Sequence, residues 1–156
     1  MIHPTAIIDA DAELGQNVEV GPYCIVGPGV VLGHNVVLKS HVVIRGPSNI
    51  GRGVQIYQFA TVGEDTPALA YEGEDSVLEV GEGTIIREGV TIHRGMAKRG
   101  IQKTIIGSNC LLMAYVHVGH DCIVGNNVIM ANNSSLSGHV EVGDFANFGG
   151  YSGCLL

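Results

Sequence analysis

A branched aliphatic residue recurs at every sixth position through the first third of the chain, and this period limits the possible folds more than any other feature. A period of six matches neither the 3.6-residue repeat of an α-helix nor the two-residue alternation of a strand. It is typical of a parallel β-helix, in which three short strands and three corners make one coil. We therefore predict an all-β fold of hexapeptide repeats. The series runs Ile2, Ile8, Leu14, Val20, Val26, Leu32, Leu38, Ile44, Ile50, Ile56 and Val62.

Two other positions of the repeat have a predicted role. The residue four places after the aliphatic one is small or β-branched, as in Ala6 and Val18, and is expected to fill the interior beside it. Glycine often follows the aliphatic residue directly, as at Gly15 and Gly21, where we expect it to help turn the corner. The four cysteines form no CxxC pair and are expected to be small core residues, not disulfides, metal ligands or nucleophiles: Cys24, Cys110, Cys122 and Cys154.

The period breaks twice and resumes, so we expect a single β-helix domain over residues 1–156 with loops near 64–77 and 95–103. Insertions in repeat proteins commonly lie on the binding face, although a tolerated surface loop is the simpler interpretation. The first loop is acidic, and four basic residues lie in or beside the second: Arg94, Lys98, Arg99 and Lys103. A basic loop on a chain of net charge −7 could receive a phosphate-bearing or acidic partner; a solvated loop without a partner is the alternative.

Composition and charge exclude some classes of protein. No run of about 18 apolar residues occurs, so no membrane span is expected. We find no charged segment followed by an apolar one at the amino terminus, and we therefore expect a cytoplasmic protein. The net charge of −7 argues against general nucleic-acid binding.

Seven histidines divide into two groups. His3, His34 and His41 lie in regular early repeats and are expected to be surface residues. The others, His93, His117, His120 and His139, cluster around the two loops. Three hexads make one coil, so residues 18 apart should stack about 4.8 Å apart along the ladder.

This stacking places His120 beside the backbone N–H of Gly138, with His139 next to it and His117 just before the same corner. Acyl transfer needs such a pair, because a base deprotonates the acceptor and an amide stabilises the oxyanion. Exposed polar corner residues are the alternative. Asp121 could orient a ring of its own chain. Because neighbouring strand residues point to opposite faces, it could instead serve a histidine of another subunit. The same alternation separates His117 from His120, and no metal site is expected.

Several stretches together resemble the UDP-N-acetylglucosamine O-acyltransferase family, whose reaction is the first step of lipid A biosynthesis. Single hexapeptides are weak evidence, but TIHRG, H-x-x-H-D-C and N-N-x-x-L-x-G-H in this order are specific. The similarity covers nearly the whole chain and is carried by IYQFATVGE (56–64), IREGVTIHRG (86–95), LLMAYVHVGHDC (111–122), ANNSSLSGHV (131–140), the amino-terminal IHPTAII and VLKSHVVI (37–44).

The resemblance implies a left-handed parallel β-helix that forms a homotrimer with active sites between subunits. It implies transfer of a 3-hydroxyacyl chain from acyl carrier protein to the 3-hydroxyl of UDP-N-acetylglucosamine, without a cofactor. In this resemblance His120 is the general base and Gly138 supplies the oxyanion amide. His93, His117 and His139 line the substrate pocket, and Asp121 supports a histidine.

The chain departs from the family in three places. Ala68 and Ala70 stand where the family has the Asp and Lys of an Asp-Leu-Lys-Tyr segment, and Leu155-Leu156 stand where it has His-Gln. The family also continues with further coils and a C-terminal helical domain, so we expect a truncated form or a diverged homologue. Two alternative functions remain open: a related hexapeptide acyltransferase with another acceptor, and a catalytically impaired or non-enzymatic β-helix.

Overall fold

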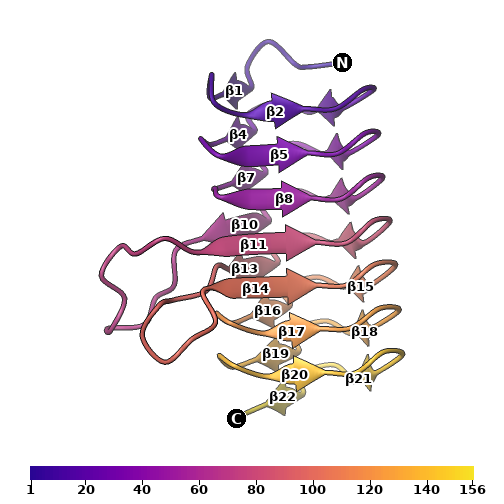
Figure 1. Cartoon of the computed structure of the whole chain (residues 1–156). Coiled ribbons are helices and arrows are strands. Elements are labelled where there is room, and N and C mark those ends of the chain that lie inside the picture. Colours follow the sequence, from indigo (N-terminus) through magenta and orange to yellow (C-terminus); the bar gives the residue numbers. More distant parts are fainter.

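The computed structural model describes all residues from 1 to 156 and contains short strands and no helix. The strands form three parallel sheets, which are the three faces of a prism (Figure 1). Each coil adds one strand to each sheet, and the chain winds from the amino terminus at one end of the prism to the carboxyl terminus at the other. The turns are left-handed, against the usual right-handed rule for parallel crossovers. The predicted left-handed parallel β-helix of hexapeptide repeats is therefore confirmed.

We name the three faces sheets A, B and C. Sheet A contains β3 (Glu19–Val20), β6 (Val37–Leu38), β9 (Gln55–Ile56), β12 (Ile85–Ile86), β15 (Leu111–Leu112), β18 (Ile129–Met130) and β21 (Asn147–Phe148). Sheet B contains β1 (Ile7–Ile8), β4 (Ile25–Val26), β7 (Val43–Ile44), β10 (Thr61–Glu64), β13 (Thr91–His93), β16 (His117–Val118), β19 (Ser135–Leu136) and β22 (Gly153–Cys154). Sheet C contains β2 (Glu13–Leu14), β5 (Val30–Leu32), β8 (Ser48–Ile50), β11 (Val77–Val80), β14 (Lys103–Ile106), β17 (Ile123–Val124) and β20 (Glu141–Val142).

The aliphatic residues of the repeat fill the interior of the prism. Ile44, Ile92 and Leu112 are fully buried and belong to one continuous cluster of 32 residues. Ile2, at one end of the prism, differs, with 49% of its surface exposed. All four cysteines are free, three of them are buried, and Cys154 is half-buried. Burial of each sixth residue thus provides the main stabilisation of the fold.

The corners correct the role that we expected of glycine. Gly15 and Gly21 do not have the left-handed backbone; they lie where an added Cβ would be 2.7 and 2.8 Å from backbone atoms of the next coil. The left-handed residue comes three places after the aliphatic one, as in Asn17 (φ 57°) and Tyr23 (φ 58°). Glycine directly after the aliphatic residue therefore permits close stacking of coils, while the residue three places after it turns the chain. Glycine also occurs at this turning position, as at Gly29 (φ 68°) and Gly53 (φ 69°).

The two loops leave the prism at the same corner, between sheets B and C (Figure 1). The first spans 65–76 and the second spans 94–102, and they contact each other. Lys98 Nζ lies 2.5 Å from Glu72 Oε1, and the amide of Ala97 donates to Glu74 Oε1 at 2.9 Å. The guanidinium of Arg94 donates to the carbonyl of Gly63 at 3.1 Å. One cation of the basic loop, Lys98, is thus paired within the chain, which favours the interpretation without an acidic partner for the second loop.

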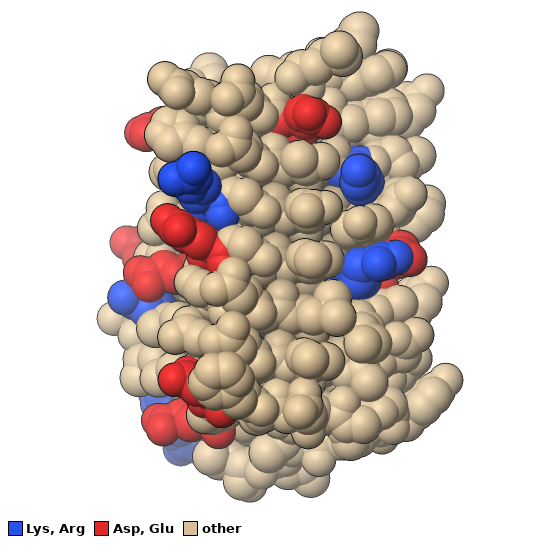
Figure 2. Space-filling model, turned by 90° about the vertical axis from the view of Figure 1, so that its right-hand side faces the viewer, with Lys and Arg blue, Asp and Glu red and all other residues tan.

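The face opposite the loops carries few charged side chains. Figure 2 shows that these lie mainly near its edges, with a largely uncharged band between them. Ile85, Leu111 and Ile129 are successive partners on the outer surface of sheet A. No helix in this structure has the length and apolar character that crossing a membrane requires.

Candidate functional site

The predicted site residues come from the ends of adjacent sheet B strands, at the corner from which the loops project. His117 is in β16, and His120 and Asp121 form the turn that follows it. His139 occupies the same turn one coil later, after β19. Asp121 and His139 both have left-handed backbones, with φ of 59° and 65°. Since such residues recur in coil after coil, this conformation is a property of the fold and does not by itself mark a site.

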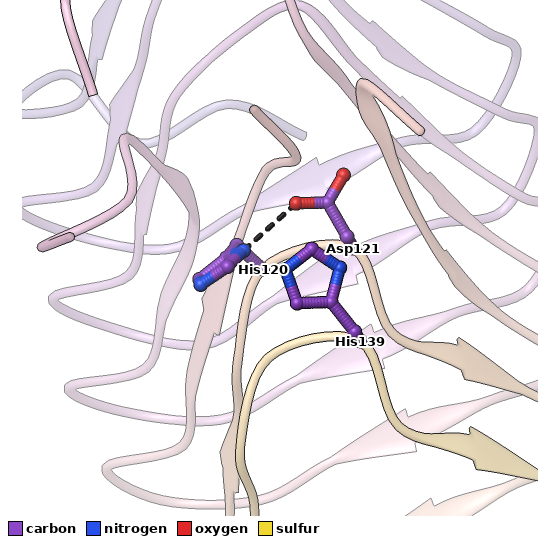
Figure 3. A group of neighbouring side chains, drawn as sticks. All are labelled: His120, Asp121 and His139. Carbon is purple, nitrogen blue, oxygen red and sulfur yellow. Dashed lines mark hydrogen bonds and ion pairs between the residues drawn. The ribbon is translucent and has the colours of Figure 1, made fainter. Parts of the chain in front are cut away.

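His120 and Asp121 form a hydrogen-bonded pair within one chain. His120 Nδ1 lies 2.7 Å from Asp121 Oδ2, and Figure 3 shows the ring turned toward the carboxylate. Of the two alternatives for Asp121, the structure therefore supports the one in which it orients a ring of its own chain, and not the one in which it points toward another subunit. The two residues lie in a turn and not on a strand, so the alternation of strand side chains does not apply. A carboxylate can only accept at Nδ1, which leaves Nε2 of the neutral ring free to take a proton.

Gly138 stacks directly against the His120 ring, as the 18-residue repeat predicts. A Cβ added to Gly138 would lie 2.5 Å from His120 Nε2 and 2.6 Å from Cε1, so only glycine fits beside the ring. The amide of His139 donates to the carbonyl of His120 at 3.0 Å, which fixes the register of the two turns. The amide of Gly138 donates no hydrogen bond within the chain. An imidazole nitrogen and an unpaired amide N–H therefore lie side by side.

The other three histidines surround this pair. The ring of His139 packs edge-on against that of His120, with centroids 4.8 Å apart. His117 Nδ1 lies 2.8 Å from Thr91 Oγ1, and the His117 ring is 5.4 Å from that of His93. His93 Nδ1 donates in turn to the carbonyl of Asp65 in the first loop, at 2.7 Å. One corner thus holds four imidazoles, whereas the structure leaves His3, His34 and His41 exposed elsewhere, as expected.

Burial dominates the electrostatics of His117. It lowers the pKa of the His117 imidazole below its usual value, and the positive charges that His93 and His120 can carry lower it further. The neutral form of His117 is therefore favoured in the folded protein.

One group of side chains has the composition of a metal site. The ligand atoms of His120, Asp121 and His139 lie within 4.8 Å of one another. The carboxylate of Asp121, however, already accepts hydrogen bonds from His120 and from the amides of Met96 and Ile101. The Asp121 side chain has no exposed surface, so it can influence a bound molecule only through its hydrogen bond to His120. This set is better suited to orient an imidazole than to bind a cation.

Sequence reasoning missed the contacts that hold Asp121. Thr104 is fully buried, and its hydroxyl accepts the amide of Asp121 at 2.9 Å. The amides of Met96 and Ile101 come from the second loop. A weak indication of Thr104 was present in the sequence, since this residue is polar at an interior position of the repeat. No indication of the loop amides was present, because every residue except proline carries a backbone amide N–H.

Comparison with known proteins agrees with the fold. The family model of the bacterial transferase hexapeptide (six repeats) matches residues 1–34, 11–46 and 103–138. Left-handed coils of hexapeptides with a polar site at one corner therefore place the chain among the hexapeptide-repeat transferases.

Individual relatives define the family more narrowly. The chain is 53% identical over 97% of its length to acyl-[acyl-carrier-protein]–UDP-N-acetylglucosamine O-acyltransferase of Stutzerimonas stutzeri. It matches the solved structure of LpxA from Acinetobacter baumannii, with 48% sequence identity over 97% of the chain and a TM-score of 0.96. It also matches that of LpxA, a UDP-N-acetylglucosamine acyltransferase, from Bacteroides fragilis, with 33% sequence identity over 96% of the chain and a TM-score of 0.73. The chain belongs to the UDP-N-acetylglucosamine acyltransferase family. It spans 58% of the length of each of the first two relatives and 67% of the third.

Proposed function

We propose that this chain transfers a 3-hydroxyacyl group from acyl carrier protein to the 3-hydroxyl of UDP-N-acetylglucosamine, the first step of lipid A biosynthesis. The observation that carries the proposal is the His120–Asp121 pair, with its free imidazole nitrogen beside Gly138. The names of the relatives support the two substrates. No cofactor is needed, because the thioester of the donor is already activated.

The reaction follows from the positions of these groups. His120 Nε2 removes the proton of the sugar 3-hydroxyl while Asp121 holds Nδ1. The hydroxyl oxygen attacks the thioester carbonyl, and the negative charge that forms on the carbonyl oxygen is stabilised by the amide of Gly138. When the intermediate collapses, the C–S bond breaks and the carrier thiolate takes the proton from His120. An ester has formed, a thiol has left, and the imidazole is neutral again.

His93, His117 and His139 are proposed to line the pocket for the sugar nucleotide and the acyl chain. The four imidazoles lie on an outer corner of the prism, and one corner cannot enclose a substrate. We therefore propose that the protein is a homotrimer in which a second copy closes the site. Sedimentation should show a trimer at micromolar concentration, and a monomer alone would contradict the shared site.

Substitution of the base tests the proposed function. In His120→Ala, kcat for acyl transfer should fall by about 10²-fold or more, the usual contribution of a general base. His117→Ala and His139→Ala should raise KM for the sugar nucleotide more than they lower kcat. His34→Ala is the matched control, because His34 is an exposed histidine in a regular coil. An unchanged kcat in His120→Ala would show that His120 is not the base, and a parent chain without acyl transfer would favour the non-enzymatic alternative.

The first loop gives a reason to test a second acceptor. Ala68 and Ala70 replace an Asp and a Lys of the family motif, and Ala70 is exposed. In the double variant Ala68→Asp/Ala70→Lys, affinity for UDP-N-acetylglucosamine should rise, because the lysine regains a charge-assisted contact. If calorimetry shows no change while His120→Ala still abolishes acyl transfer, the chain is an acyltransferase for another acceptor.

A further inference from the structure

The carboxylate of Asp121 is enclosed by the second loop. The amide of Ile101 donates to Oδ1 at 2.9 Å, and the amide of Met96 donates to Oδ2 at 3.1 Å. The remaining partner of Oδ2 is the ring of His120, at 2.7 Å. Two backbone amides from one loop therefore hold the two oxygens, while the imidazole contacts Oδ2 alone.

Two glycines make this close approach possible. A Cβ on Gly100 would lie 2.6 Å from both Asp121 oxygens and would overlap the carbonyl of Met96. A Cβ on Gly95 would lie 2.7 Å from Asp121 Oδ1 and would overlap the amide nitrogen of Lys103. Backbone, and no side chain, fits on either side of the carboxylate.

No lysine or arginine forms an ion pair with this carboxylate, whose only ion-pair partner is His120. Lys98 is paired with Glu72, and the guanidinium of Arg94 donates to the carbonyl of Gly63. The ionisable groups that face the carboxylate are His120, which is bonded to it, and His139, which packs against the ring of His120. Neutral amides stabilise a negative charge without cancelling it, so the charge acts on the imidazole. Met96 is 4% exposed, and the side chain of Asp121 has no exposed surface.

We propose that the loop 94–102 is the positioning element of the site, because its amides at Met96 and Ile101 fix the Asp121 carboxylate and thereby hold His120 with the proton on Nδ1. Gly95 and Gly100 are its essential residues. The expected change in kcat rests on the proposed function, but the expected position of the proton on the His120 ring does not.

The variant Gly100→Ala tests the proposal with two measurements. In the parent, nitrogen NMR of labelled histidine should show His120 with its proton on Nδ1. In Gly100→Ala the signal of the Nε2–H form should appear. The value of kcat should fall about tenfold to a hundredfold, the range for a lost hydrogen bond to a charged group. KM for UDP-N-acetylglucosamine should stay unchanged. Gly149→Ala is the matched control, since an added Cβ there meets no atom within 4 Å.

The outcomes separate this proposal from the proposed function. If Gly100→Ala folds and keeps both the Nδ1–H signal and the kcat of Gly149→Ala, the loop does not position His120. If the proton moves but the parent shows no acyl transfer, the positioning role stands and the proposed function fails. Should Gly100→Ala not fold, Asp121→Asn tests the same contacts by changing the carboxylate instead of the loop. The amide proton signals of Met96 and Ile101 should then shift and exchange faster, and unchanged signals would overturn the proposal.

Discussion

Gly138→Ala should inactivate the proposed site while leaving the fold intact. The added Cβ would lie 2.5 Å from His120 Nε2, whereas ordinary contacts begin at 3.4 Å, so the ring must move by about 1 Å. The ring cannot move freely, because it is bonded to Asp121 at 2.7 Å and packs against His139. A displacement of about 1 Å can cost about 10²-fold in rate, which corresponds to about 2.7 kcal/mol in the activation barrier.

The assay compares kcat for acyl transfer in Gly138→Ala and in Gly149→Ala, where the same methyl group meets open space. Thermal melting should be similar for both variants, since Gly138 does not have a left-handed backbone and lies outside the core. Nitrogen NMR should show the His120 signals displaced only in Gly138→Ala. If the two variants have the same kcat, the His120 ring does not act from the position described, and the argument for its role fails.

Three further predictions concern folding, pH and thiol chemistry. Val118→Asp should prevent folding, because it puts an unpaired charge in the fully buried interior, whereas Asn147→Asp on an exposed strand position should melt like the parent. The pKa of His117 is lowered in the folded state, so the unfolded chain binds more protons. The free energy of unfolding should therefore fall as pH drops through about 6.5 toward the folded pKa. Denaturant titrations should show a smaller loss of this free energy in His117→Gln. Burial raises the pKa of the Cys122 thiol to about 11, so stability should decline as pH rises from 9 toward that value. A thiol reagent at neutral pH should modify half-buried Cys154 and leave Cys122 unmodified until the protein unfolds; equal labelling of both would refute this.

The sequence by itself determined the interior and the stacking of the coils. Each strand of a coil places one side chain, such as Ile44 or Ile92, in the interior, where burial favours an aliphatic residue. This spacing is therefore visible in the sequence as an aliphatic residue at every sixth position. The same repeat placed Gly138 against His120, since one coil is a fixed number of residues wherever no loop intervenes. It also separated the exposed histidines of the early coils from the four near the loops. The handedness came from the family resemblance and not from the period, because a period has no hand.

Only the tertiary structure decided how the corner works. Asp121 turns toward His120 because both lie in a turn with a left-handed residue, while the alternative of a contact with another subunit assumed strand geometry. Lys98 and Glu72 pair across two loops of unrelated length, and the amides of Met96 and Ile101 reach a side chain 25 and 20 residues further along the chain. The loops have no repeat, so their path is set by contacts that form only after the coils have stacked. Backbone amides are also the same in every residue, and only the folded chain shows which of them meet a carboxylate.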